Sequence, residues 1–220
     1  MKNPWLGFRH SEQMVHPLDE ASVNEYNLTS KRDYQYLLNL APEPWIGNID
    51  GNLLVLYSNP GATRENLNGI SPPYYKLVIE KSIKNLNQEN PQYPHFYFDP
   101  AMASTEGAKW FAAKYKWLID EVGVSVLARN LLTCELSPYH SFRWKPPKKQ
   151  LQTQKFTFEI VKKAMARDAL ILIARSNKIW TENIPDLARY PRTLTPNSIN
   201  ASVSPGNYPR GFEEILSKLK

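Results

Sequence analysis

Cysteine is almost absent from this 220-residue chain, in which Cys134 is the single thiol. One cysteine excludes a disulfide scaffold, a four-cysteine zinc site and an iron–sulfur cluster held by cysteines alone. No run approaches the ~18 consecutive apolar residues of a membrane span. The first residues, from Met1 to Trp5, lack the apolar segment of a signal peptide. These absences predict a cytoplasmic, monomeric protein with no membrane segment.

Patterns for binding metals or cofactors are also missing. The four histidines, His10, His16, His95 and His140, do not have the spacing of metal ligands. The sequence also contains no glycine-rich phosphate loop and no dinucleotide-binding motif. We therefore expect neither a metal nor a cofactor. Hydrophobic residues make up 42% of the chain and aromatic residues 12%, which excludes global disorder.

Acidic residues become scarce towards the end of the chain. Residues 1–140 hold 12 Lys/Arg and 15 Asp/Glu, a net charge of −3, whereas residues 141–220 hold 15 and 6, a net of +9. The sum is the +6 of the whole chain. Such a basic C-terminal part indicates a polyanionic partner, with DNA as the expected one. Its densest run, residues 143–149, is either part of that interface or a solvated loop.

Four apolar runs are typical of buried strands in a parallel sheet. They are Leu53–Tyr57, Val124–Leu127 with its extension Asn130–Cys134, Ala169–Ala174 and Ser198–Val203. Apolar stripes at helical spacing lie in residues 110–122, 156–165 and 212–219, with a weaker one in 34–40. Ser104 or Thr105 can cap the first helix, and Gly123 can end it.

Alternating strands and helices predict an α/β fold, a three-layer sandwich around a central, mostly parallel sheet. We expect a single domain over residues 1–220, with residues 1–44 as a helical N-terminal extension. Ligands of such sheets bind beyond the carboxyl ends of the strands, so the residues after each run are candidates for the site. These residues are 58–61, 135–140, 175–178 and 204–209.

Three segments of the chain are similar to the motifs of one enzyme family. The first is Tyr57-Ser58-Asn59-Pro60-Gly61 after a strand, the second is Gly69-Ile70-Ser71-Pro72-Pro73-Tyr74, and the third is Ser202-Val203-Ser204-Pro205-Gly206-Asn207. Together they resemble the uracil-DNA glycosylase superfamily, in particular its mismatch-specific and single-strand-selective branches. The resemblance runs loosely from Trp45 to Lys220. It implies that fold and a monofunctional glycosylase, which hydrolyses the N-glycosidic bond of a flipped-out base and leaves an abasic site.

The resemblance assigns roles to a few residues in or next to the first two motifs. Asn59 would hold the attacking water through its amide; the alternative is that Asn59 only begins a turn. Pro60 and Gly61 would shape the loop so that backbone N–H groups face the base. Tyr74 or Tyr75 would stack on the base. No lysine occupies a motif position that suggests Schiff-base chemistry.

Two departures from the family pattern bear on the choice of base. The uracil-restricted branch has a tyrosine directly after the proline, where this chain has Gly61 followed by Ala62, which leaves the 5-position of the base open. Glu135 ends a strand where the family commonly has asparagine. An ionised carboxylate only accepts, which suits the N4 amino group of cytosine better than O4 of uracil.

Open space at the 5-position of the base, together with a carboxylate that accepts a hydrogen bond from the base, indicates a 5-modified cytosine. Examples are the hydroxymethylated or glucosylated cytosine of some phage DNA. An enzyme that makes abasic sites there would serve antiviral defence. Two alternatives concern Glu135 itself: it is a strand-end residue paired with Arg175, or it is protonated and donates to O4.

The third motif lacks the family's histidine. Alignment on the Ser-Pro pair puts Ser202 at the position of the histidine, and alignment on the strand end puts Asn200 there. Either residue can donate one neutral hydrogen bond to O2 of the base. Hydroxyl and backbone donors to phosphates would come from Ser204, Gly206 and Asn207. Tyr208 would fill the gap left by the flipped nucleotide, or it is a packed tyrosine after a turn.

Six basic residues complete the predicted DNA interface, namely Arg143, Lys145, Lys148, Lys149, Arg175 and Lys178. Two other functions remain open from the sequence. One is repair of uracil or another deaminated base, and the other is a non-catalytic nucleic-acid-binding module on the same fold.

Overall fold

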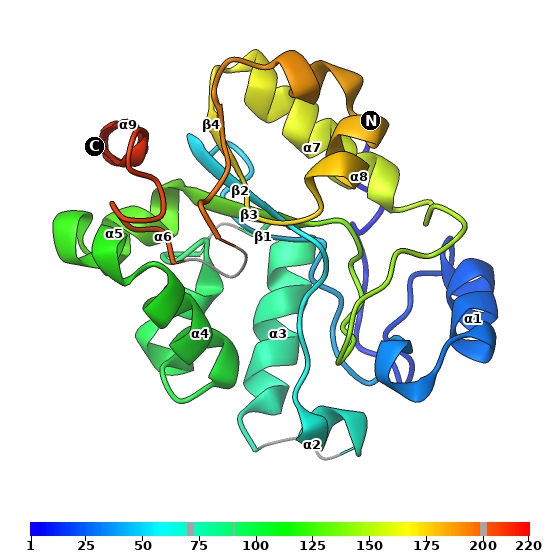
Figure 1. The fold of residues 1–220 in the computed structure, drawn as a ribbon. Coiled ribbons are helices and arrows are strands. Elements are labelled where there is room, and N and C mark those ends of the chain that lie inside the picture. The colour runs from blue at the N-terminus through cyan, green and yellow to red at the C-terminus, as the bar shows by residue number, and fades with distance from the viewer. Residues whose placement is uncertain (70–72, 90, 199–201) are drawn as a thin grey trace. The chain divides into compact units, whose positions relative to one another are not determined.

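The computed structural model describes residues 1–69, 73–89, 91–198 and 202–220. The chain forms two compact units, each assembled from three separate segments. The first unit consists of Met1–Trp45, Ser58–Glu89 and Glu135–Glu159, and the second of Ile46–Tyr57, Asn90–Cys134 and Ile160–Lys220. Figure 1 shows their helices and strands in the colours of the chain.

A five-stranded sheet, most of it in the second unit, has the order β1-β3-β2-β4-β5 (Figure 1). Its strands are β1 (Trp45–Gly47), β2 (Leu53–Tyr57), β3 (Leu131–Glu135), β4 (Leu170–Ile173) and β5 (Thr193–Leu194). The pairs β2–β4 and β4–β5 are parallel, and Leu53 lies opposite Leu170. This confirms the predicted α/β fold with a mostly parallel sheet.

Burial explains why β2 and β4 could be recognised in the sequence. Every residue of both strands is buried, as expected for strands whose two faces are both covered. The short strand β1 depends on Gly47, which has φ +112°. A Cβ there would lie 2.2 Å from the carbonyl oxygen of Leu131 at the start of β3. Only glycine allows the two strands to come this close.

The helices belong to one unit or the other, except for α7, which spans both. The first unit holds α1 (Glu20–Thr29), α2 (Arg64–Leu67) and α3 (Tyr75–Leu86). The second holds α4 (Glu106–Lys114), α5 (Lys116–Val122), α6 (Val124–Asn130), α8 (Asn177–Asn183) and α9 (Phe212–Ser217). Helix α7 covers Gln154–Ala166, and short 3-10 helices cover Arg32–Tyr34, Phe96–Phe98, Pro100–Met102 and Pro185–Arg189. None of the helices in these described ranges has the length and apolar character needed to cross a bilayer.

The predicted helix over residues 110–122 is confirmed, with a break in its middle. Thr105 caps α4, because its side chain accepts a hydrogen bond from the backbone N–H of Ala108. Tyr115 separates α4 from α5. Gly123 ends α5 with φ +80°, a conformation that favours glycine.

Two predicted elements are wrong, and a third is tested only in part. Val124–Leu127 belongs to helix α6, and only residues from Leu131 onward form the expected strand. The run 198–203 contains no strand among its described members, and residues 199–201 lie outside the described residues. The stripe over residues 34–40 contains only the end of a 3-10 helix, since Gln35 already has extended backbone angles.

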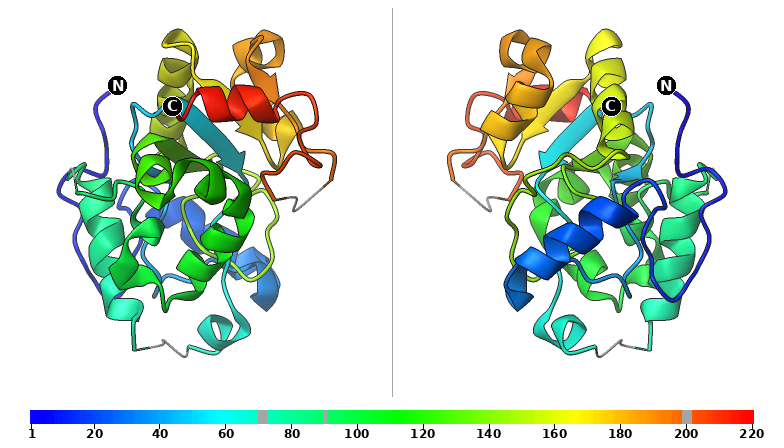
Figure 2. Two further views of the ribbon diagram at one scale, coloured as in Figure 1. Left: turned by 90° about the vertical axis from the view of Figure 1, so that its left-hand side faces the viewer. Right: turned by 90° about the vertical axis from the view of Figure 1, so that its right-hand side faces the viewer.

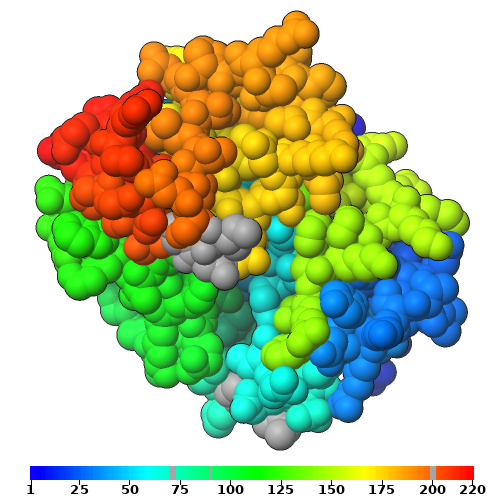
Figure 3. Space-filling view, viewed as in Figure 1, coloured from blue at the N-terminus to red at the C-terminus, as the bar shows by residue number. Residues whose placement is uncertain are grey.

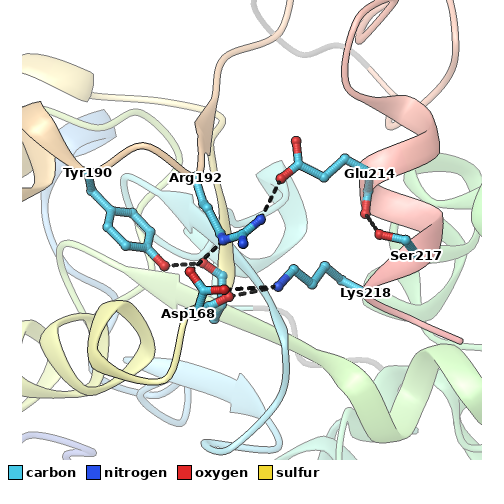
Figure 4. Close-up of polar contacts among 7 residues, drawn as sticks. Asp168, Tyr190, Arg192, Glu214, Ser217 and Lys218 are labelled. Carbon is cyan, nitrogen blue, oxygen red and sulfur yellow. Dashed lines mark hydrogen bonds and ion pairs between the residues drawn. The ribbon is translucent and has the colours of Figure 1, made fainter.

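The C-terminal helix α9 is anchored to the start of β4 by a network of charges (Figure 4). Arg192 donates to the carboxylate of Asp168 and lies 3.3 Å from that of Glu214 on α9, while Nζ of Lys218 donates to the carbonyl of Asp168 at 2.8 Å. The Arg192 hydrogen bond holds the pKa of the Asp168 carboxyl below its usual value. Figure 2 shows α9, in red, beside the orange segment that carries β5.

A fully buried carboxylate organises the first unit. Asp19, with 0% exposure, accepts hydrogen bonds from the Tyr139 hydroxyl at 3.0 Å and from the backbone N–H of Thr153 at 3.0 Å. The Thr153 hydroxyl also donates to it, at 2.5 Å. Burial, together with the negative charge of Asp19, holds the pKa of Tyr139 well above its usual value. Three donors thus compensate the desolvation of one carboxylate and join segments more than a hundred residues apart.

Buried His95 in the second unit makes folding stability depend on pH. Its ring has 0% exposure and contacts Phe98 and Phe111 at centroid distances of 4.8 and 4.6 Å. Burial lowers its pKa from 6.5 to about 3. Between these values the unfolded chain binds a proton that the folded chain does not, so stability falls as the pH is lowered.

We expect protonation of His95 in the unfolded chain to lower the free energy of unfolding by about 2 kcal/mol when the pH is lowered from 7 to 5. His95→Gln should remove most of that dependence. Urea unfolding of both proteins at the two pH values measures it. Equal losses in the two proteins would contradict the assignment to His95.

Candidate functional site

Asn59 lies two residues after the end of the buried strand β2, and its amide has a defined orientation. The Nδ2 group donates to the carbonyl of Pro60 at 2.8 Å and to Oγ of Ser141 at 3.0 Å. A carbonyl oxygen only accepts, so the atom facing Pro60 is the amide nitrogen. Both N–H bonds are used, and Oδ1 has no donor among the described residues. The half-buried side chain therefore presents a fixed carbonyl oxygen that can accept a hydrogen bond from water.

The turn after Asn59 is held from behind by Ser141 and His140, to which the sequence analysis assigned no role. Gly61 forms a parallel bridge with Ser141. The ring of His140, 8% exposed, lies 2.7 Å from the Gly61 carbonyl through Nδ1 and 3.0 Å from the Ala41 carbonyl through Nε2. The ring therefore links the loop at Gly61 to the segment that precedes β1.

A buried carboxylate lies beside this ring. Oε2 of Glu43 lies 3.8 Å from Nε2 of His140, and Oε1 accepts from Ser82 of α3 at 3.1 Å. Glu43 is 4% exposed. The imidazole ring and the Glu43 side chain, both buried, thus back the loop at Gly61.

The ends of β2 and β3 lie side by side, as expected from the rule for parallel sheets. The N–H of Ser137 donates to the Ser58 carbonyl at 2.9 Å, just past both strands. Asn59 and the half-buried Glu135 are therefore at the same edge of the sheet. Gly61 is exposed, and a Cβ built on it meets no atom of the described residues within 4 Å.

The two candidate stacking residues differ in how they are placed at the start of α3. Tyr74 is the N-cap residue, and Tyr75 is the first residue of the helix. The hydroxyl oxygen of Tyr75 is fully enclosed. Burial and the nearby Glu43 raise the pKa of Tyr75 well above its usual value. Both rings are half-buried, and the enclosed hydroxyl of Tyr75 makes Tyr74 the better candidate for a ring that contacts a ligand.

The third motif belongs to the second unit, where Asn207 organises it. Its Nδ2 donates to the Ser202 carbonyl at 3.0 Å and to Oγ of Ser204 at 3.2 Å. Gly206 is exposed. Tyr208 is 4% exposed, so its wedge role remains a prediction that requires the ring to leave this packing. Asn200 lies outside the described residues.

The predicted DNA-binding cations fall into paired and unpaired groups. Lys149 lies 2.7 Å from Glu25, Arg143 lies 3.5 Å from Asp33, and Lys178 lies 3.8 Å from Glu182. All three pairs are exposed, so a phosphate could replace the carboxylate at little cost. No carboxylate pairs with the exposed side chains of Lys145, Lys148 or Arg175 within the described ranges.

Lys114, at the end of α4, is a further charged residue that the sequence analysis missed. It is 9% exposed, and its ammonium lies over the rings of Trp110 at 5.5 Å and Tyr57 at 5.9 Å. The Tyr57 hydroxyl is hydrogen-bonded to that of Tyr115 at 2.8 Å. Cys134 is fully buried in β3, in agreement with a structural thiol.

The described part of the chain contains no group of three or more His, Cys, Asp or Glu side chains that could hold a metal ion. No protein-family model, curated protein or solved structure matches this chain. Functional inference therefore starts from the residues themselves.

Proposed function

We propose that this protein is a DNA glycosylase with a uracil-DNA glycosylase-like fold, which hydrolyses the N-glycosidic bond of a flipped-out base. The observation that carries the proposal is the amide of Asn59. Its nitrogen is fully used by Pro60 and Ser141, and its oxygen is left to accept. Hydrolysis requires a water held beneath the anomeric carbon and oriented by an acceptor, which is the part that a fixed carbonyl oxygen can play.

The other roles follow the resemblance described above. Tyr74 or Tyr75 stacks on the extruded base, and Ser202 or Asn200 donates to its O2. The unpaired cations Lys145, Lys148 and Arg175 contact phosphates, and the exposed ion pairs exchange their carboxylates for phosphates. In this proposal the protein acts on DNA as a cytoplasmic monomer without a cofactor.

The proposed base is a 5-modified cytosine, and two observations support this choice. The open space at Gly61 leaves room for a substituent at the 5-position. The carboxylate of Glu135 at the same edge of the sheet is suited to accept from the N4 amino group. Excision of hydroxymethylated or glucosylated cytosine from phage DNA would make the protein an antiviral defence enzyme.

A panel of duplexes tests the proposal. Each duplex carries one uracil, hypoxanthine, cytosine, hydroxymethylcytosine or glucosylated hydroxymethylcytosine, and alkali cleaves the strand wherever an abasic site has formed. Breaks only with modified cytosine support the proposed base, and breaks with uracil support a repair enzyme. Salt-sensitive DNA binding with no breaks in any duplex would show a non-catalytic binding module.

Glu135→Gln should change the ranking of bases in that panel. The amide can donate to O4 and still accept, so the ratio of cytosine-type to uracil cleavage should fall by about 10-fold or more, given ~1–3 kcal/mol for a well-formed base contact. Single-turnover rates on the two duplexes measure the ratio. Glu65→Gln, on the exposed helix α2, is the matched control and should leave the ratio unchanged. An unaltered ratio in Glu135→Gln would remove Glu135 from the specificity argument.

A further inference from the structure

The side chain of Lys114, in the second unit, is buried, but one of its neighbours is exposed to solvent. Its ammonium lies over the rings of Tyr57 and Trp110, which form its aromatic pocket. Trp110 is 48% exposed, so the pocket borders the surface formed by α4, green in Figure 3. Contact with two aromatic faces partly compensates a cation for lost hydration. Among the residues that the structure describes, Nζ has no hydrogen-bond acceptor.

The charges around Lys114 disfavour its protonated form. No carboxylate lies within ion-pair distance of Nζ among the residues described by the structure. The charged group that acts on it is Arg175, after β4. The hydroxyl of the Tyr57 ring that Lys114 contacts is hydrogen-bonded to that of Tyr115. Burial, followed by the positive charge of Arg175, lowers the pKa of Lys114 to about 8. Near neutral pH the neutral amine is then roughly 200-fold more abundant than at an ordinary lysine.

Lys114 also contacts one residue of each outer motif. Its side chain lies over Tyr57, the first residue of the 57–61 motif and two positions before Asn59. Its backbone carbonyl accepts from the N–H of Val203, inside the third motif, at 2.9 Å. A lysine distant from both motifs in the sequence is therefore in contact with each of them in the fold.

We propose that Lys114 is the nucleophilic amine of an abasic-site lyase, placed by its aromatic pocket to react with the aldehyde that base removal creates. This inference rests on the proposed glycosylase for its substrate. It goes beyond the monofunctional activity that the sequence motifs imply.

The reaction needs no oxidant, reductant or metal. Neutral Nζ adds to C1′ of the ring-opened sugar, and loss of one water forms an imine. The C2′ proton then passes to solvent, the C3′–O bond breaks, and the 3′ phosphate leaves with the bonding electron pair. Hydrolysis of the imine returns the free amine and releases an unsaturated aldehyde on the 5′ fragment.

The test uses DNA that already contains an abasic site, so that it does not depend on base excision. The full-length protein is incubated with this oligonucleotide and sodium cyanoborohydride, which reduces the imine to a stable amine. We expect a covalent protein–DNA adduct on a denaturing gel, with peptide mass spectrometry locating it at Lys114. The rate of trapping should rise with pH and reach half of its maximum near pH 8.

Three variants separate an amine nucleophile from other roles. Lys114→Met should reduce trapping at least ~10-fold, and so should Lys114→Arg, which keeps the positive charge. Lys109→Met, an exposed lysine on the same helix that pairs with Glu106, should trap normally. Thermal unfolding shows whether each variant is folded, and the mass spectrum of the wild-type adduct tests the proposal without any variant.

Adduct formation on another residue, or unchanged trapping in folded Lys114→Met, would overturn the proposal. So would absence of an adduct when fluorescence anisotropy shows the abasic DNA to be bound. Normal function of Lys114→Arg would indicate a phosphate contact instead, and would also overturn it. Trapping at Lys114 without cleavage in the base panel would refute the glycosylase alone, and base excision without trapping would refute the lyase alone.

Discussion

Asn59→Ala is expected to lower the rate of base release by about 10²–10³-fold, the usual loss when one preorganised polar group is removed from a transition state. The alanine removes the carbonyl oxygen that would orient water, while the buried strand β2 that carries it remains intact. DNA binding should change little, because the predicted phosphate contacts come from other residues. Single-turnover cleavage and fluorescence anisotropy on the preferred duplex measure the two effects separately.

Two further variants make this result specific. Asn52→Ala removes an exposed asparagine just before the same strand and should cleave normally. Ser141→Ala removes one of the two acceptors that hold the Asn59 amide, and should reduce the rate by less than Asn59→Ala does. Normal cleavage by Asn59→Ala would show that Asn59 only begins a turn, and the proposed mechanism would then be wrong.

Asp19→Ala is expected to destabilise the protein by about 3–5 kcal/mol, the largest stability effect that we predict. It leaves the buried donors of Tyr139 and Thr153 without their acceptor, and each unsatisfied donor costs ~1–3 kcal/mol. Asp19→Asn keeps one acceptor oxygen and should cost about half as much. Urea unfolding followed by far-UV circular dichroism measures both losses.

Asp33→Ala is the matched control for this prediction. Asp33 is an exposed partner of Arg143 at 3.5 Å, and such surface pairs contribute ~0–1 kcal/mol. Equal, small losses in Asp19→Ala and Asp33→Ala would contradict the view that the buried carboxylate organises the first unit.

The sequence predicted those elements whose pattern has one physical explanation. In β2 and β4, short runs are apolar on both faces, and only a covered strand explains them in a chain of this composition. Val124–Leu127 was misassigned because four residues of mixed polarity fit a strand or one turn of helix equally well. The deciding feature is Gly123, whose positive φ ends α5 and lets a new helix start at once.

The sequence could predict those residues of the site that lie at the ends of the strands. Asn59 follows β2 and Glu135 ends the adjacent strand β3, and the rule for strand ends places them at one edge of the sheet. Ser141 lies just beyond the strand-end candidates, and His140 lies among them without a predicted role. Their contacts with Asn59 and Gly61 could not be predicted, because they join positions about 80 residues apart. Lys114 was missed for a related reason, since its aromatic pocket combines a strand residue with a residue from its own helix.

The division of each unit into three segments has a consequence for how the chain must be handled and how it folds. The chain crosses between the units five times, after residues 45, 57, 89, 134 and 159. Any continuous fragment that contains all of one unit also contains pieces of the other, so truncation cannot isolate either one. Pairing of Leu53 with Leu170 closes a loop of more than a hundred residues, and such distant pairings slow folding. Refolding should therefore require most of the polypeptide, with little native sheet forming before β4 is present.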